Sequence, residues 1–144
     1  MMEKTQVSSR SIEKELFIKA TPERVFQALS TKEDLECWFL SKGEIDLRPG
    51  GAIRFNWKPG ETDFGKILVL DPPHRLSYTL EAPGVTTITF ELKEENGGTR
   101  LYLTHTGIGG GDDWDRYYSQ VSNGWDVHLG NLAIWLETGR EKDW

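Results

Sequence analysis

Residues 112–139 have the sequence DDWDRYYSQVSNGWDVHLGNLAIWLETG, and this stretch decides what the rest of the chain must provide. It contains no proline, and apolar side chains recur in it at steps of three and four residues. These positions are Val121, Trp125, His128 or Leu129, Leu132 and Leu136. On a 3.6-residue period they form one apolar stripe, which predicts a long amphipathic helix. At about 1.5 Å per residue the helix spans roughly 30 to 38 Å, so the upstream chain must supply a surface of that length.

Both ends of this predicted helix carry sequence signals. The aspartates within residues 112–115 suit the positive end of the helix dipole, and Gly139 suits a C-terminal stop. Two glycines, Gly124 and Gly130, lie in the helix interior, where each costs roughly 1 kcal/mol relative to alanine. We therefore expect a neighbouring segment or a ligand to need room beside them.

Composition limits the class of protein. The chain has 144 residues, 37% hydrophobic and 11% aromatic, which suits a single domain over residues 1–144 with a loose arm at residues 1–10. The net charge of -6 argues against nucleic acid or an anionic membrane as the main partner, because both favour a positive patch. Cys37 is the one cysteine, and the first residues hold no apolar run typical of a signal peptide. No stretch approaches the ~18 apolar residues of a membrane span, so we expect no stable membrane insertion. We further expect the protein to be cytoplasmic and monomeric.

The first third of the chain predicts one strand and two short helices. Residues 12–20 alternate apolar and polar side chains, as a half-buried strand does. Thr21 followed by proline and an acidic residue is a typical helix start. Thr31 with Asp34 three residues later resembles a capping box, which opens a second helix that ends near Trp38.

From residue 43 to residue 106 the chain changes to short alternating runs separated by turn signals, which is typical of an antiparallel meander. Six strands are expected, around Ile45–Leu47, Ile53–Trp57, Phe64–Leu70, Leu76–Leu80, Val85–Glu94 and Leu101–His105. The sequence Asn96-Gly97-Gly98 predicts a hairpin turn, because such turns need residues that tolerate positive φ. Each strand has one apolar and one polar face, so we expect the long helix to cover one side of the sheet. The result is an α+β fold.

A curved seven-stranded sheet wrapped around one helix often leaves space between the two, so we expect a cavity lined by large aromatic residues. The candidate ligand-binding residues are Trp38, Phe39, Phe55, Trp57, Tyr78, Phe90, His105, Trp125, His128, Leu129 and Leu132. The alternative for the aromatic members is that they only pack in the hydrophobic core. The same two interpretations, core packing or ligand contact, apply to Phe64 and Trp135. Tyr78 and the tryptophans carry polar tips, so they are the aromatic residues we most expect to touch a ligand.

Two histidines are the most distinctive polar candidates. Period two turns His105 inward from the last strand, and the helical period places His128 on or near the apolar stripe. Facing each other across a cavity, they would suit orientation of a ligand carbonyl or hydroxyl, or acid–base work. The alternative is a histidine that hydrogen-bonds to backbone or to structural water.

Standard catalytic and cofactor motifs are absent from the sequence. One cysteine and three dispersed histidines lack the spacing of metal ligands, so no metal is expected. There is no nucleophile elbow, phosphate loop or dinucleotide fingerprint, so no cofactor and no catalytic residue are assigned. Whether the protein is an enzyme stays open, with binding favoured over catalysis.

Several motifs together resemble a known family. They are residues 18–30 (IKATPERVFQALS), Trp38-Phe39, Pro49-Gly50-Gly51, residues 71–76 (DPPHRL), the hairpin at 96–103 with residues 104–108 (THTGI), and Gly124-Trp125 with Leu129 and Leu132. The chain is similar, from about residue 11 to residue 138, to the activator of heat shock protein 90 ATPase homologue family of the START-like, helix-grip superfamily. The resemblance implies a curved antiparallel seven-stranded sheet around a long C-terminal helix, with two short helices after the first strand.

Three functional hypotheses follow. The leading one is binding of a small hydrophobic molecule, lipid-like or of polyketide or flavonoid type, between the sheet and the helix. The second, implied by the resemblance, is a stand-alone activator of a chaperone ATPase with a chaperone partner. The third is a cyclase or hydrolase that uses an inward histidine or carboxylate. An apolar lining does not identify a ligand, so ligand identity is not predicted.

Overall fold

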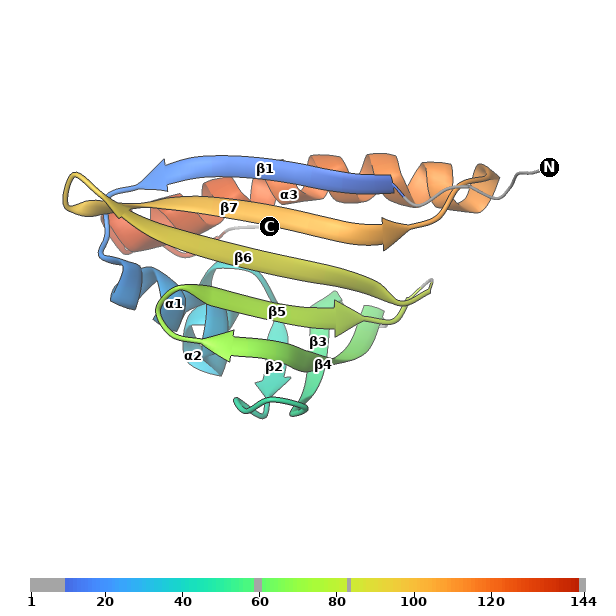
Figure 1. Ribbon diagram of the computed structural model, residues 1–144, viewed down its shortest axis with the longest axis horizontal. Helices are drawn as coiled ribbons and strands as arrows, with labels where there is room; N and C mark the ends of the chain where they lie inside the picture. Colours follow the sequence, from blue (N-terminus) through green and yellow to red (C-terminus); the bar gives the residue numbers. More distant parts are fainter. Residues whose placement is uncertain (1–9, 59–60, 83, 143–144) are drawn as a thin grey trace.

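The structure is a computed structural model that describes residues 10–58, 61–82 and 84–142 (Figure 1). Its elements are β1 (Arg10–Ile18), α1 (Pro22–Ser30), α2 (Lys32–Trp38), β2 (Lys42–Ile45), β3 (Ala52–Lys58), β4 (Glu61–Asp71), β5 (Arg75–Leu80), β6 (Thr86–Glu95), β7 (Gly98–Ile108) and α3 (Asp112–Thr138). The strands form one seven-stranded antiparallel sheet in the order β1-β7-β6-β5-β4-β3-β2. This confirms the α+β architecture predicted from the sequence.

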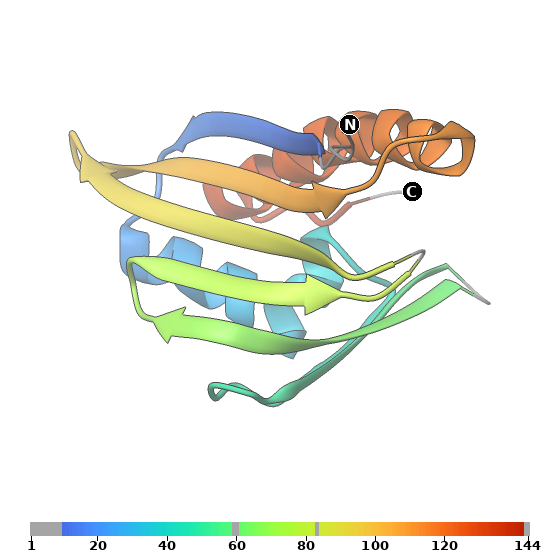
Figure 2. The same cartoon turned by 45° about the vertical axis from the view of Figure 1, so that its right-hand side comes forward.

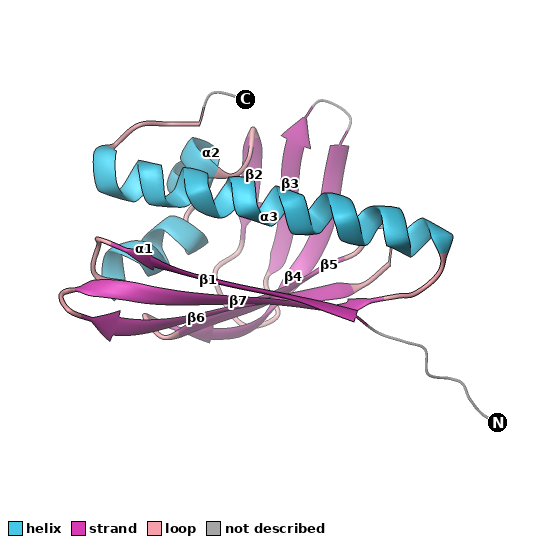
Figure 3. Ribbon diagram, turned by 90° about the horizontal axis from the view of Figure 1, so that it is seen from above, coloured by secondary structure: helices cyan, strands magenta, loops and turns pink. Residues whose placement is uncertain are grey.

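Helix α3 covers one face of the sheet. Seen from above, β1, β7 and β6 run along one side of α3 while β2 and β3 curl up behind it (Figure 3). Helices α1 and α2 lie on the same side of the sheet as α3 (Figures 2 and 3). The stripe residues Trp125, Leu129 and Leu132 are buried, as their spacing predicts. Gly139 ends the helix in a left-handed conformation with φ of 77°, and its N–H donates to Trp135 O.

A buried carboxylate joins the three helices. Asp34 on α2 accepts two hydrogen bonds from the Arg24 guanidinium on α1, at 2.8 and 2.9 Å. The same carboxylate accepts a hydrogen bond from the indole Nε1 of Trp135 on α3 at 2.9 Å. The hydrogen bonds from Arg24 are the main reason that the pKa of Asp34 lies below its usual value, although burial opposes them. The carboxylate predicted to cap α2 therefore also positions the C-terminal half of α3.

Several predicted boundaries were wrong by a few residues. β1 begins at Arg10, inside the predicted arm, whose remaining residues 1–9 lie outside the described chain. β2 ends at Ile45, and Leu47 is 43% exposed, because backbone hydrogen bonds within residues 46–52 already form the turn to β3. Phe64 is 52% exposed on the outer face of β4, so it is not part of the core, and it lies outside the cavity lining described below.

The buried stripe gives a direct stability test. Replacing Leu132 by alanine removes a fully buried side chain, so Leu132→Ala is expected to lower the free energy of unfolding by roughly 2 to 5 kcal/mol. The control is Val127→Ala on the outer face of α3, where the side chain is 60% exposed and a change within about 0.5 kcal/mol is expected. Urea unfolding measures both. Equal small losses for the two variants would contradict the packing of α3 described above.

Candidate functional site

A cavity of about 560 Å³ lies between residues 117–128 of α3 and the curled part of the sheet. Five of the residues predicted to bind a ligand line it: Phe39, Trp57, His105, Trp125 and His128. They come from the end of α2, from β3, from β7 and from α3, which are far apart in the sequence. The fold therefore brings these five together at one place.

The other six predicted residues lie in the core and not in the lining of this cavity: Trp38, Phe55, Tyr78, Phe90, Leu129 and Leu132. The polar tip of Trp38 is satisfied inside the protein, because its Nε1 donates to Ala28 O at 2.8 Å. Full burial raises the pKa of the Tyr78 hydroxyl above its usual value. Of the residues singled out for their polar tips, Trp57 and Trp125 therefore line the cavity, whereas Trp38 and Tyr78 do not.

The cavity is also lined by nine residues that were not predicted as ligand-binding residues, and four of them are polar. The further lining residues are Glu61, Asp63, Leu80, Ala82, Ile88, Tyr117, Gln120, Val121 and Gly124. A signal for Asp63 exists, because Ile67 is buried and period two places Asp63 on its side of β4. A signal for Tyr117 also exists, since it precedes Val121 by one helical turn on the stripe of α3.

Hydrogen bonds fix the tautomer of His105. The indole Nε1–H of Trp125 donates to His105 Nδ1 at 3.0 Å, so Nδ1 acts as an acceptor and carries no proton. The proton is on Nε2, which donates to Thr86 Oγ1 at 2.9 Å, and the Tyr117 hydroxyl lies 3.5 Å from the same nitrogen. Burial lowers the pKa of His105 to about 4, which agrees with a neutral ring. Both ring nitrogens of His105 thus have side-chain partners. Nδ1 is the unprotonated nitrogen, so it could act as a general base only if its hydrogen bond from Trp125 were broken.

The Trp125 ring contacts both histidines edge to face. The ring centroids are 6.2 Å apart for His105 and Trp125 and 5.9 Å apart for Trp125 and His128. His128 also meets Phe39 edge to face at 4.9 Å. Burial lowers the pKa of His128 to about 4, so this ring is also neutral at physiological pH. His105 and His128 therefore line the same cavity, as predicted, and Trp125 contacts both rings.

Phe39 is the centre of the aromatic wall. The ring of Trp125 stacks on it with centroids 5.5 Å apart, and Trp57 meets it edge to face at the same distance. Such offset and perpendicular pairs are the favourable geometries of aromatic side chains. The lining near these rings is therefore rigid and apolar.

The polar part of the lining includes two acidic residues, Glu61 and Asp63. Asp63 is 9% exposed, and its Oδ1 accepts backbone N–H hydrogen bonds from Phe64, Glu81 and Ala82 at 2.8, 2.9 and 3.1 Å. These bonds hold the segment that follows β5 against the start of β4. Glu61, two residues earlier on β4, is exposed.

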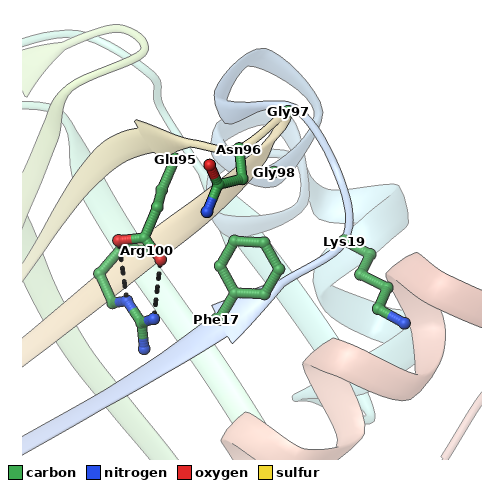
Figure 4. A pocket seen from close by; sticks show the side chains of 7 residues that line it. All are labelled: Phe17, Lys19, Glu95, Asn96, Gly97, Gly98 and Arg100. Atoms are coloured by element: carbon green, nitrogen blue, oxygen red, sulfur yellow. Dashed lines mark hydrogen bonds and ion pairs between the residues drawn. The ribbon is translucent and has the colours of Figure 1, made fainter.

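A second hollow, of about 520 Å³, lies at the hairpin between β6 and β7 (Figure 4). Arg100 there pairs with Glu95 at 2.8 Å, so its guanidinium is engaged, and Phe17 is the one aromatic ring labelled in the close-up. Lys19 and Asn96 in its lining are exposed. Because this hollow lacks a buried aromatic wall, the cavity beneath α3 is the candidate site.

Neither a metal site nor a membrane-spanning helix is found within residues 10–58, 61–82 and 84–142. Within the part of the chain that the structure describes, no three His, Cys, Asp or Glu side chains are grouped to hold a metal ion. None of the helices among the described residues is long and apolar enough to cross a membrane.

The buried histidines predict a pH dependence of stability. In the unfolded chain a histidine has a pKa near 6.5, whereas burial in the fold lowers it to about 4. The unfolded state therefore binds more protons below pH 6.5, and stability that is complete above that pH is lost as the pH falls toward 4. Between pH 7.5 and pH 5, each histidine accounts for a loss of about 2 kcal/mol.

Urea unfolding at pH 7.5 and pH 5 tests this linkage. His105→Gln is expected to reduce the pH-dependent loss by about 2 kcal/mol, because glutamine does not titrate. His74→Gln at an exposed position is the control and is expected to keep the full loss. An unchanged loss in the His105→Gln protein would contradict the buried neutral histidine.

Comparison with known proteins places this geometry in a family. The family model described as activator of Hsp90 ATPase homolog 1-like protein matches residues 19–137. Protein MLL2253 from Mesorhizobium loti shares the fold with a TM-score of 0.81 at 24% identity, over 89% of this chain and 97% of that chain. The solution structure of the Aha1 dimer from Colwellia psychrerythraea is similar with a TM-score of 0.80 at 25% identity, over 90% of this chain and 98% of that one.

CalU16 from Micromonospora echinospora is a further structural relative, with a TM-score of 0.75 and 26% identity over 91% of this chain and 78% of that chain. A comparison with curated proteins gives no match. The match to the family model nevertheless covers most of the chain and agrees with the observed sheet and helices. The chain therefore belongs to the activator of Hsp90 ATPase homolog 1-like family.

Proposed function

We propose that the protein binds a small, mainly apolar ligand in the cavity beneath α3. The observation that carries this proposal is the cavity of about 560 Å³ with aromatic walls from Phe39, Trp57 and Trp125. Ligand pockets fall in the range of about 300 to 1,000 Å³ and are mostly apolar with a few placed polar groups. The volume and the lining both agree with this pattern.

The polar groups that would orient a ligand differ from those expected at first. The sequence favoured His105, Tyr78 and His128. His128 lines the cavity, whereas Tyr78 lies outside the lining and both nitrogens of His105 already have partners. Tyr117 and Gln120 of α3 line the cavity instead. We assign ligand orientation to the Tyr117 hydroxyl, with His105 holding the Trp125 wall in place.

The alternative functions are weighed against the same geometry. A reaction that uses an inward histidine as a base conflicts with the hydrogen bonds of His105, so we favour binding over catalysis. Family membership keeps activation of a chaperone ATPase as the second candidate. A protein partner would bind the outer surface of the domain. A substitution that fills the cavity is therefore expected to weaken ligand binding and to leave binding of a protein partner unchanged, which separates the two functions.

Two glycines of α3 offer matched variants for the test. A Cβ at Gly124, which lines the cavity, would meet only the His128 ring, at 3.8 and 3.9 Å. A Cβ at Gly130, which is exposed, would meet nothing within 4 Å. Leucine at either position improves helix propensity by roughly 0.5 to 1 kcal/mol, so neither variant is expected to lose stability through the helix.

Naphthylbutanol, a neutral apolar probe, measures the occupancy of the cavity. Isothermal titration calorimetry is expected to show saturable binding to the wild type and to Gly130→Leu. The leucine side chain of Gly124→Leu fills space that the probe needs, so its affinity is expected to fall by at least about tenfold. Absence of binding to the wild type, or equal affinity for both leucine variants, would contradict the proposed function.

A further inference from the structure

The charge of the cavity lining has one sign. Among the described lining residues, Glu61 and Asp63 are acidic and none is lysine or arginine. His105 and His128 add no positive charge at neutral pH, because burial holds the pKa of each at about 4. An anion that entered this cavity would therefore meet negative charge without a compensating cation from the lining.

Asp63 places this charge inside the protein and not only at the mouth. Its side chain is nearly buried, and three backbone N–H groups hold Oδ1 in a fixed position. The charge of Asp63 also acts on Tyr117. Burial is the main reason that the pKa of the Tyr117 hydroxyl is raised, and a hydrogen bond with Thr86 opposes this effect. The negative charge of Asp63 raises the same pKa further. Because Tyr117 lines the cavity, a ligand beside it experiences the same field.

The aromatic wall is the second feature that bears on a cationic ligand. Trp57 and Trp125 flank Phe39 with centroid distances of 5.5 Å. Tryptophan is the ring whose face attracts a cation most strongly, and the attraction grows when the cation is removed from water. A carboxylate and several aromatic rings around one apolar cavity form the chemistry that recognises an ammonium group on an apolar body.

We infer that this cavity selects apolar ligands that carry a cationic amine over apolar acids of the same size. The inference rests on the proposed function and narrows it to a ligand class. The apolar body of the ligand lies against Ile88 and Trp125, and its ammonium group lies between Asp63 and the tryptophan rings. An apolar carboxylate would place its charge beside Asp63 and is disfavoured by repulsion.

Three probes with one apolar skeleton test the inference: naphthylbutylamine, naphthylbutanol and naphthylbutyrate. Calorimetric titration at pH 7.4 and one fixed ionic strength is expected to show the amine binding at least about tenfold more tightly than the carboxylate, with the alcohol between them. The amine is protonated and the acid is ionised at this pH, so charge is the main difference among the three.

Asp63→Asn assigns the effect to one carboxylate. The side-chain carbonyl of asparagine can still accept the three backbone hydrogen bonds, whereas the negative charge is removed. The affinity for the alcohol is expected to stay within about twofold, and the preference for the amine over the alcohol is expected to disappear. The control is Asp46→Asn, which removes an equal charge from an exposed pair with Arg48 and is expected to leave the preference intact.

The possible outcomes separate this inference from the proposed function. Binding of the alcohol with no preference for the amine would overturn the inference and leave the proposed function in place. No binding of any probe would overturn both. An amine preference that persists in Asp63→Asn would overturn the assignment to Asp63, and if that variant fails to fold, the order of the three probes on the wild type decides the inference.

Discussion

The hydrogen bond from Trp125 Nε1 to His105 Nδ1 is the interaction on which the candidate site depends. It joins α3 to β7 at 3.0 Å between two buried side chains. Leaving either group unsatisfied would cost roughly 1 to 3 kcal/mol, so the bond fixes how α3 lies over the sheet. The bond leaves the proton of His105 on Nε2, which donates to Thr86 on β6. It also holds the Trp125 ring in place as one wall of the cavity.

Polar anchors hold the two ends of α3, and the cavity lies beneath the half between them that begins at Tyr117. Near the N-terminal end, Arg10 on β1 pairs with Asp115 at 2.8 Å and donates to Gly109 O at 2.7 Å. At the other end, Trp135 donates to Asp34 on α2. The helix is therefore tied to β1 near one end and to α2 near the other, and Gly124, which has no side chain, adds nothing that would fill the cavity between these anchors.

Local patterns were enough for most of the fold, and non-local pairing accounts for what they missed. The hairpin at Asn96 was predictable because its positive φ of 52° is a local requirement that the sequence displays. For Asp63 the pattern is ambiguous, because the register of β4 against β5 shifts between Ile67 and Val69. Counting back by twos from Ile67 gives an inward Asp63, whereas counting back from Leu70, across the irregularity, gives an inward Phe64. The partner of His105 likewise depends on α3 crossing β7, which no local spacing encodes.

The most direct test of the account is where an apolar ligand lies. Isotope-filtered NMR of the labelled protein with unlabelled naphthylbutanol would identify the protons in contact with the probe. Binding beneath α3 is expected to give intermolecular contacts to the methyl groups of Ile88 and Val121 and to the Trp125 ring, which line the cavity. Contacts confined to exposed apolar residues such as Phe64 and Val127 would contradict it.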